Sequence, residues 1–143
     1  MGHSAGGHIT QMMMGTKWSN LEIMLPNDLI KAGIPISPLS YLEPVRLTEA
    51  LNAGIRMDEL EAENQSPMTQ HPPVTNAPQL VAVGGLETTE FHRQAQMYVD
   101  AYNSKERIIK FFEVPNVDHF DELNILEDSQ SSFFKETIRL IKL

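Results

Sequence analysis

The sequence predicts an α/β protein in which about three parallel strands are flanked by helices. The first supporting observation is a continuous apolar run over residues 80–83, closed by two glycines. Such a run is typical of a strand buried on both faces of a parallel sheet. The second is the alternation of strand-like and helix-like segments along the 143 residues. Sheets built this way bind ligands at the carboxyl ends of their strands.

The spacing of apolar side chains predicts the elements in order. Strands are expected over residues 31–37, 80–83 and 107–114, although Pro35 is unfavourable inside the first. Helices are expected over residues 5–16, 45–53, 57–64, 90–103 and 131–141, with Gly54 separating the second from the third. Residues 66–78 contain four prolines and are expected to form a loop.

Composition excludes several classes of function. A net charge of −8 argues against nucleic-acid partners, which require a basic face. The absence of cysteine excludes disulfides, thiolate metal sites and cysteine nucleophiles. No apolar run approaches the ~20 residues of a membrane span, and the first residues do not resemble a signal peptide. We therefore expect a cytoplasmic protein with no membrane partner and no cofactor.

Residues 2–6 fit the G-x-S-x-G pattern of a nucleophile elbow. In such an elbow the serine occupies a sharp, strained strand-to-helix turn, so small residues must flank it. Ser4 would then stand at a helix N-terminus, where free N–H groups stabilise a developing oxyanion, and the Ala5 N–H is the natural first donor. We expect Gly6 and Gly7 to let this helix press against the sheet. The alternative is that Ser4 simply caps a glycine-rich helix.

Two further residues complete the order serine, acid, histidine that this elbow requires. Glu87 follows the strand at 80–83, and His119 follows the strand at 107–114. Glu90 and Asp118 are rival acids. We expect Glu90 to complement the N-terminus of its own helix, and we expect the Asp118 side chain to point away from its neighbour His119.

Four segments of the sequence point to a specific family: residues 2–8, 40–44, 84–94 and 117–120. Together they resemble the kynurenine formamidase (arylformamidase) family of the α/β-hydrolase superfamily, across essentially the whole chain. The resemblance implies metal-free hydrolysis of N-formylkynurenine to kynurenine and formate, with Ser4 as nucleophile, Glu87 as acid and His119 as base. The chain departs from the family at position 87, where it has Glu and Asp is frequent. It also has no counterpart of the family's preceding half, whose H-G-G motif supplies the remaining oxyanion donors.

This resemblance predicts a partial α/β-hydrolase fold that starts at the elbow, with residues 1–143 as the C-terminal portion of a single domain. The strand leading into Ser4 is expected to be missing, because only three residues precede it. An exposed sheet edge should favour self-association. Loss of one oxyanion donor costs ~10²–10³ in kcat, so we expect little or no activity from the chain alone.

Two alternatives remain open at this stage. The first is that the chain is an enzyme acting on a small-molecule substrate; within this class, a carboxylesterase of the lipase/esterase branch is the alternative to an arylformamidase. The second is that the chain is an inactive fragment or an interaction subunit. Tyr41 is a candidate for lining the substrate pocket, with plain packing as the alternative. Four histidines show no metal-ligand spacing with a carboxylate, so we expect them to be structural or exposed and expect no metal: His3, His8, His71 and His92.

Overall fold

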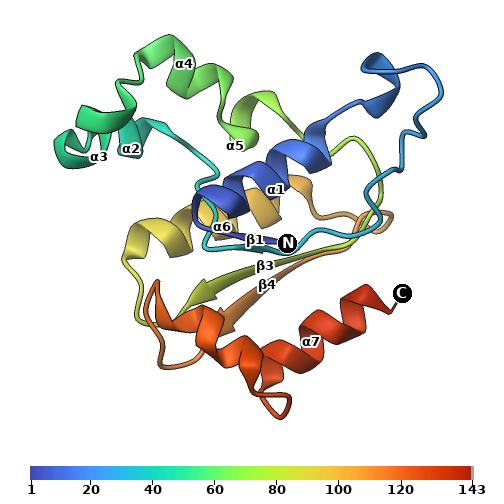
Figure 1. Ribbon diagram of the computed structural model, residues 1–143, viewed down its shortest axis with the longest axis vertical. Coiled ribbons are helices and arrows are strands. Elements are labelled where there is room, and N and C mark those ends of the chain that lie inside the picture. The colour runs from blue at the N-terminus through green and yellow to red at the C-terminus, as the bar shows by residue number, and fades with distance from the viewer. Residues whose placement is uncertain (143) are drawn as a thin grey trace.

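The computed structural model describes residues 1–142 and has a four-stranded parallel sheet at its centre (Figure 1). The strand order follows the chain: β1 (Gly2–His3), β2 (Pro35–Ile36), β3 (Gln79–Gly84) and β4 (Ile109–Val114). The α/β prediction is confirmed, and the sheet has one strand more than the expected three.

The additional strand is β1, so the prediction that no strand leads into Ser4 is wrong. Gly2 pairs with Pro35 and His3 with Ile36, which is enough to form a two-residue strand at the edge of the sheet. Pairing of so few residues leaves no periodicity that a sequence pattern can reveal. Pro35 is accommodated as the first residue of its strand, where proline is tolerated.

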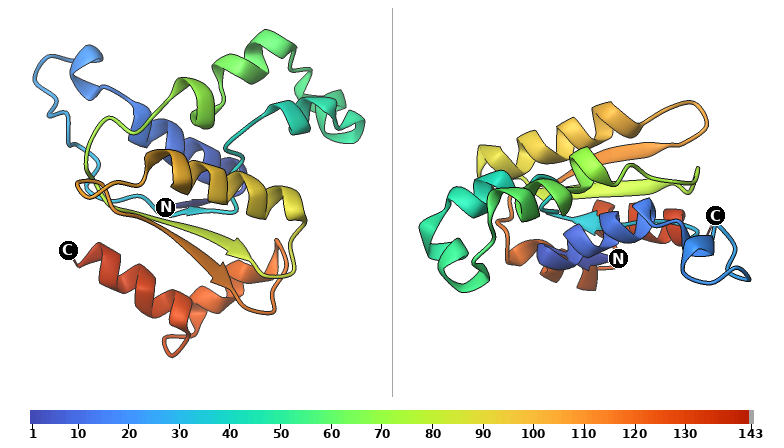
Figure 2. Two further views of the ribbon diagram at one scale, coloured as in Figure 1. Left: turned by 180° about the vertical axis from the view of Figure 1, so that it is seen from behind. Right: turned by 90° about the horizontal axis from the view of Figure 1, so that it is seen from above.

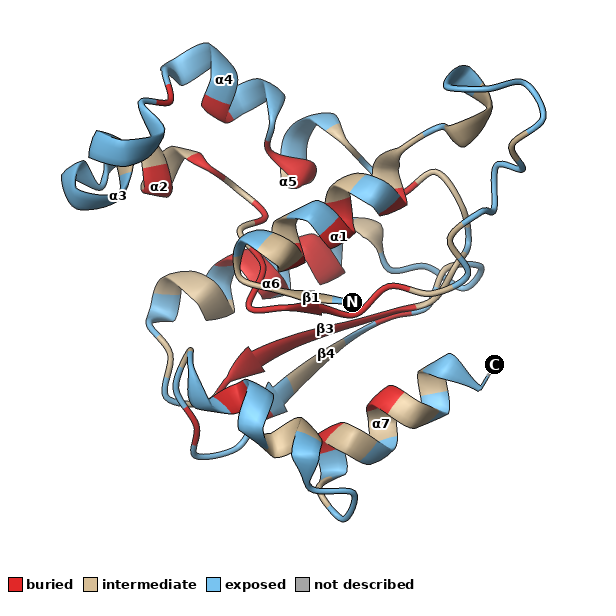
Figure 3. Cartoon of the chain, viewed as in Figure 1, coloured by how far each residue is buried: buried red, intermediate tan, exposed pale blue. Residues whose placement is uncertain are grey.

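Helices cover both faces of the sheet (Figures 1 and 2). Helices α1 (Ala5–Gly15) and α6 (Thr89–Tyr102) lie on one face, and α7 (Ser132–Ile141) lies on the other. The strand β3 between them is buried along its whole length (Figure 3). Its unbroken apolar run therefore reflects burial by helices on both sides.

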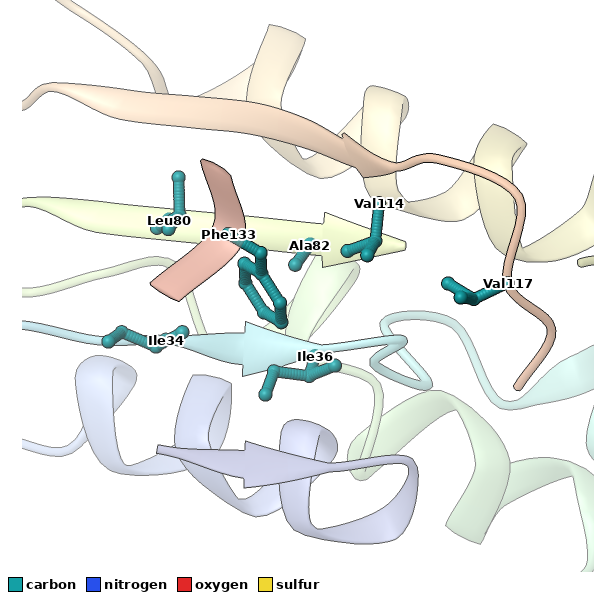
Figure 4. Close-up of a cluster of buried hydrophobic side chains, with 7 residues drawn as sticks. All are labelled: Ile34, Ile36, Leu80, Ala82, Val114, Val117 and Phe133. Atoms are coloured by element: carbon teal, nitrogen blue, oxygen red, sulfur yellow. The ribbon is translucent and has the colours of Figure 1, made fainter. Parts of the chain in front are cut away.

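The two faces of β3 belong to two different apolar clusters. On the α7 face, Phe133 packs among side chains of the strands and of the loop after β4 (Figure 4): Ile34, Ile36, Leu80, Ala82, Val114 and Val117. On the α6 face, Val81 and Val83 of β3 pack against that helix. The whole cluster is Val81, Val83, Ala95, Tyr98, Val99 and Ile109. Alternation of side chains across the strand thus joins both layers into one core.

Four short helices fill the segment between β2 and β3: α2 (Glu43–Leu47), α3 (Glu49–Ile55), α4 (Glu59–Asn64) and α5 (Pro67–Gln70). The first break falls at Thr48, whose backbone is extended, whereas Gly54 lies inside α3, so the predicted break at Gly54 is wrong. The predicted loop over 66–78 contains α5, because Pro67 occupies the first helical position, where proline suits the helix.

Two short 3₁₀ helices complete the chain: η1 (Trp18–Asn20) and η2 (Asp121–Glu127). The second of these begins two residues after His119 and brings Glu122 into the interior. Across residues 1–142, no helix combines the length and the apolar character that crossing a membrane requires.

Candidate active site

Ser4 occupies the turn between β1 and α1 with φ 55° and ψ −116°, a backbone conformation that L-residues rarely adopt. Its N–H donates to the Ile36 carbonyl at 2.9 Å, and its carbonyl accepts from the His8 N–H at 3.0 Å. These bonds hold the strained turn in place. The Ser4 side chain makes no capping hydrogen bond, so the alternative role as a helix cap is not seen.

Close backbone contacts explain the glycines of this turn. A Cβ atom on Gly2 would lie 2.3 Å from the Gly6 carbonyl oxygen, and one on Gly7 would lie 2.8 Å from the Ile36 carbonyl oxygen. A Cβ on Gly6 would meet nothing within 4 Å. Close approach of α1 to the sheet therefore requires Gly7, and the same expectation for Gly6 is wrong.

Glu87 and His119 meet beyond the carboxyl ends of β3 and β4. The His119 Nδ1 atom lies 2.6 Å from Glu87 Oε2. The Glu87 side chain is 1% exposed and that of His119 is 22% exposed. The other carboxylate oxygen of Glu87 accepts from the Gly84 N–H at 3.0 Å and from the Ser37 hydroxyl. Glu87 is thus buried and fixed by hydrogen bonds, whereas the imidazole of His119 is partly exposed.

The two rival acids are engaged elsewhere. Glu90 pairs with Arg93 at 2.6 Å, and this arginine holds the pKa of Glu90 below its usual value. Asp118 accepts from the backbone N–H groups of Phe120 and Asp121, which lower the pKa of its carboxyl in the same way. Glu87 is therefore the acid that contacts His119.

Unlike Glu87, Ser4 is not hydrogen-bonded to His119: within the described residues, no hydrogen bond joins the Ser4 hydroxyl to its imidazole. The ring that lies against His119 is that of His3, the residue before Ser4, with 4.5 Å between ring centroids. Ala5 begins α1, so its N–H belongs to the first turn, where backbone donors have no partner within the helix.

A cavity of about 210 Å³ opens beside His119. Phe91 and Phe120 lie on either side of the imidazole, with ring centroids 4.8 and 5.4 Å away. The full lining is Leu86, Glu87, Thr88, Phe91, Asp118, His119 and Phe120. Tyr41 is not among these residues; its backbone N–H donates to the Gln94 side chain at 2.8 Å.

His3 and Glu122 are site residues that the sequence reasoning missed. Glu122 is fully buried, and its Oε1 lies 3.0 Å from His3 Nε2. Burial, with the nearby Glu87 carboxylate, raises the pKa of Glu122 to about 8. Burial and the neighbouring His119 lower the pKa of His3.

Spacing could not reveal this contact, since the two residues are far apart in sequence. Sequence spacing shows no metal-ligand pattern at His3, and its contact with a carboxylate forms only in the folded chain. A signal was available nearby: Glu122 lies only three residues after His119, at the start of the 3₁₀ helix η2.

No protein-family model matches the chain. The chain is similar to kynurenine formamidase of Salmo salar, with 31% identity over 147 residues, and to kynurenine formamidase of Danio rerio, with 28% identity over 144 residues. The matches cover 99% and 98% of this chain and 48% of each relative. The chain thus spans about half the length of the curated relatives it matches.

Solved structures support the same fold. An acetyl ester-xyloside bifunctional hydrolase from Caldicellulosiruptor lactoaceticus superposes with a TM-score of 0.58 and 17% identity, covering 98% of this chain and 52% of that one. A thermophilic esterase of Thermogutta terrifontis gives a TM-score of 0.58 and 15% identity, with 99% and 51% covered. These likenesses show the fold of the chain, which is a partial α/β-hydrolase fold.

Proposed function

We propose that this chain, which is similar to kynurenine formamidases along its whole length, carries the nucleophile, base and acid of a serine hydrolase. The observation that carries the proposal is a strained Ser4, whose neighbour His3 lies against His119, together with a buried Glu87 that contacts the same histidine at the carboxyl ends of parallel strands. Strained backbone conformations of this kind gather at active sites. A histidine oriented by a buried carboxylate is the usual partner of a serine nucleophile.

In this mechanism the Ser4 hydroxyl attacks the acyl carbon while His119 Nε2 takes its proton. Glu87 accepts from Nδ1–H, which keeps the lone pair of the imidazole on Nε2 and stabilises the imidazolium that forms. The Ala5 N–H donates to the oxyanion. The imidazole then protonates the leaving amine, and water activated by His119 hydrolyses the acyl-serine.

The reaction requires His119 to approach the Ser4 hydroxyl more closely than it does without substrate. Catalytic hydrogen bonds are often long in unliganded enzymes and tighten when substrate binds. His119 is the partly exposed member of the pair, so the adjustment falls to its ring while the buried Glu87 stays in place. The proposed contact is therefore one that substrate binding completes.

We propose an aryl formamide as the substrate class. The cavity beside His119 is small, at about 210 Å³, and has aromatic rings on two sides of the imidazole, which suits a formyl group on an aromatic amine. The names of the curated relatives point to the same chemistry. An ester substrate is the second candidate, because structural neighbours are described as esterases.

A comparison of kcat/KM for N-formylkynurenine and p-nitrophenyl butyrate, measured on a version of the protein with its upstream half restored, separates these candidates. We expect the formamide to be preferred, and preference for the ester would move the chain to the esterase branch. The Ser4→Ala variant is the control, because turnover that survives it does not come from this site.

A further inference from the structure

Three potential metal ligands converge beside the proposed nucleophile. One ligand atom each from His3, His119 and Glu122 lies within 4.8 Å of the other two. The carboxylate of Glu122 is fully buried, and within the described residues neither of its oxygens makes a hydrogen bond. The buried Nε2 of His3 also lacks a hydrogen bond, although it lies 3.0 Å from Glu122 Oε1. These two atoms are close together but are not aligned as donor and acceptor.

This spacing suits coordination of a shared cation. Zinc binds histidine nitrogen and carboxylate oxygen at ~2.0–2.2 Å, so neighbouring ligand atoms on a tetrahedral ion lie roughly 3.3 Å apart. The 3.0 Å separation of His3 and Glu122 already fits this geometry. The His119 ligand atom lies within 4.8 Å of the other two, so a small adjustment of its ring would let it join them.

The hydrogen bond of His119 leaves the right nitrogen free. Glu87 accepts from Nδ1, so Nε2 is the ring atom that remains for a metal. Histidine ligands in metal sites characteristically donate their other ring N–H to a carboxylate, which fixes the tautomer and increases the basicity of the ligand nitrogen. The Glu87–His119 pair has this arrangement.

Charge favours a cation at the same place. The side chains of Glu87 and Glu122 are both buried, and within residues 1–142 their only ionic partners are histidines. When both are ionised, two buried carboxylates without a lysine or arginine partner are poorly compensated. A divalent ion held between His3, His119 and Glu122 would supply the missing positive charge.

We propose that His3, His119 and Glu122 form a binding site for a divalent transition-metal ion of the zinc type, and that the bound ion blocks the hydrolase site. The second part rests on the proposed function. A metal on His119 Nε2 takes the lone pair that must accept the Ser4 proton, so the metal-bound and catalytic states exclude each other. The ion therefore takes no part in the hydrolytic reaction and acts as an inhibitor.

Calorimetric titration of the purified, chelator-treated 143-residue chain with ZnCl₂ tests the site. We expect one ion per chain. His3→Asn and Glu122→Gln each remove a ligand and should weaken binding by more than the ~10–100-fold that loss of an outer partner costs. Glu113→Gln is the matched control, because Glu113 lies 3.8 Å from His92 in an exposed histidine–glutamate pair outside the site, and we expect its zinc affinity to be unchanged. Circular dichroism checks that each variant is folded, and two independent ligand variants keep the test decisive if one fails to fold.

Ser4→Ala separates this inference from the proposed function. The serine is not a ligand, so its variant should bind zinc like the parent chain, whether or not the parent is a hydrolase. No binding, several equivalent ions, or equal affinity in the His3 and Glu122 variants would overturn the site. Zinc affinity that persists in His119→Ala would show that the base is not a ligand and would overturn the inhibition.

Discussion

The two adjacent glycines of α1 provide a sharp test of how closely this helix approaches the sheet. A Cβ on Gly7 would lie 2.8 Å from the Ile36 carbonyl oxygen and 3.0 Å from Pro38 Cα, both of them backbone atoms that cannot rotate away. Overpacking of this kind costs about 1–3 kcal/mol. The gain from replacing a helical glycine with alanine, about 0.5–1 kcal/mol, offsets only part of it. We expect Gly7→Ala to lower the free energy of unfolding by about 1–2 kcal/mol.

Gly6→Ala is the matched control, because its Cβ would meet nothing within 4 Å. The helix gain is then not offset, and stability should stay equal or rise by up to about 1 kcal/mol. Urea unfolding followed by far-UV circular dichroism measures both variants. With m near 1–3 kcal/mol/M, the two midpoints should differ by roughly 1 M, with Gly7→Ala the lower. Equal midpoints, or the reverse order, would refute the close approach of α1 to β2.

Three further predictions concern the site and the sheet edge. In Glu87→Gln the amide can donate to His119 Nδ1, which leaves the imidazole proton on Nε2. The rate at which Ser4 reacts with a fluorophosphonate should therefore fall to the rate in His119→Ala, and a smaller loss would argue against Glu87 as the acid. The pKa of Glu122, about 8 when folded against a usual 4.5, means that the folded state holds its proton more tightly. The free energy of unfolding in EDTA should therefore fall as pH rises from about 5 to about 8, by roughly 5 kcal/mol at most, and Glu122→Gln should lose this decrease; parallel pH profiles would contradict the raised pKa. Because β1 lies at one edge of the sheet, we expect self-association in size-exclusion chromatography, and a monomer at all concentrations would count against it.

The parts of the fold that the sequence predicts correctly carry strong local signals. The apolar run of β3 identifies a buried strand, and Glu87 lies just beyond that strand, in contact with His119. The glycine pattern around Ser4 predicts a strained turn, which the φ of 55° at this residue bears out. Each of these signals lies within a few residues of the feature it predicts.

The parts that the sequence does not predict depend on contacts distant along the chain. Strand β1 exists because two residues pair with β2, more than 30 positions later, and no pattern of two residues reveals this. The contact between His3 and Glu122 joins β1 to η2, which are far apart along the chain. The close approach at Gly7, and its absence at Gly6, likewise depends on where β2 lies.

The central claim is that Ser4 is a nucleophile activated by His119. The most direct measurement is the rate at which a fluorophosphonate probe modifies Ser4 in the 143-residue chain, read by peptide mass spectrometry alongside Ser4→Ala and His119→Ala. We predict slow labelling that is confined to Ser4, is absent in Ser4→Ala, and falls at least ~10²-fold in His119→Ala, the loss expected when a general base is removed. Labelling of Ser4 no faster than that of other exposed serines, or equally fast without His119, would contradict the account.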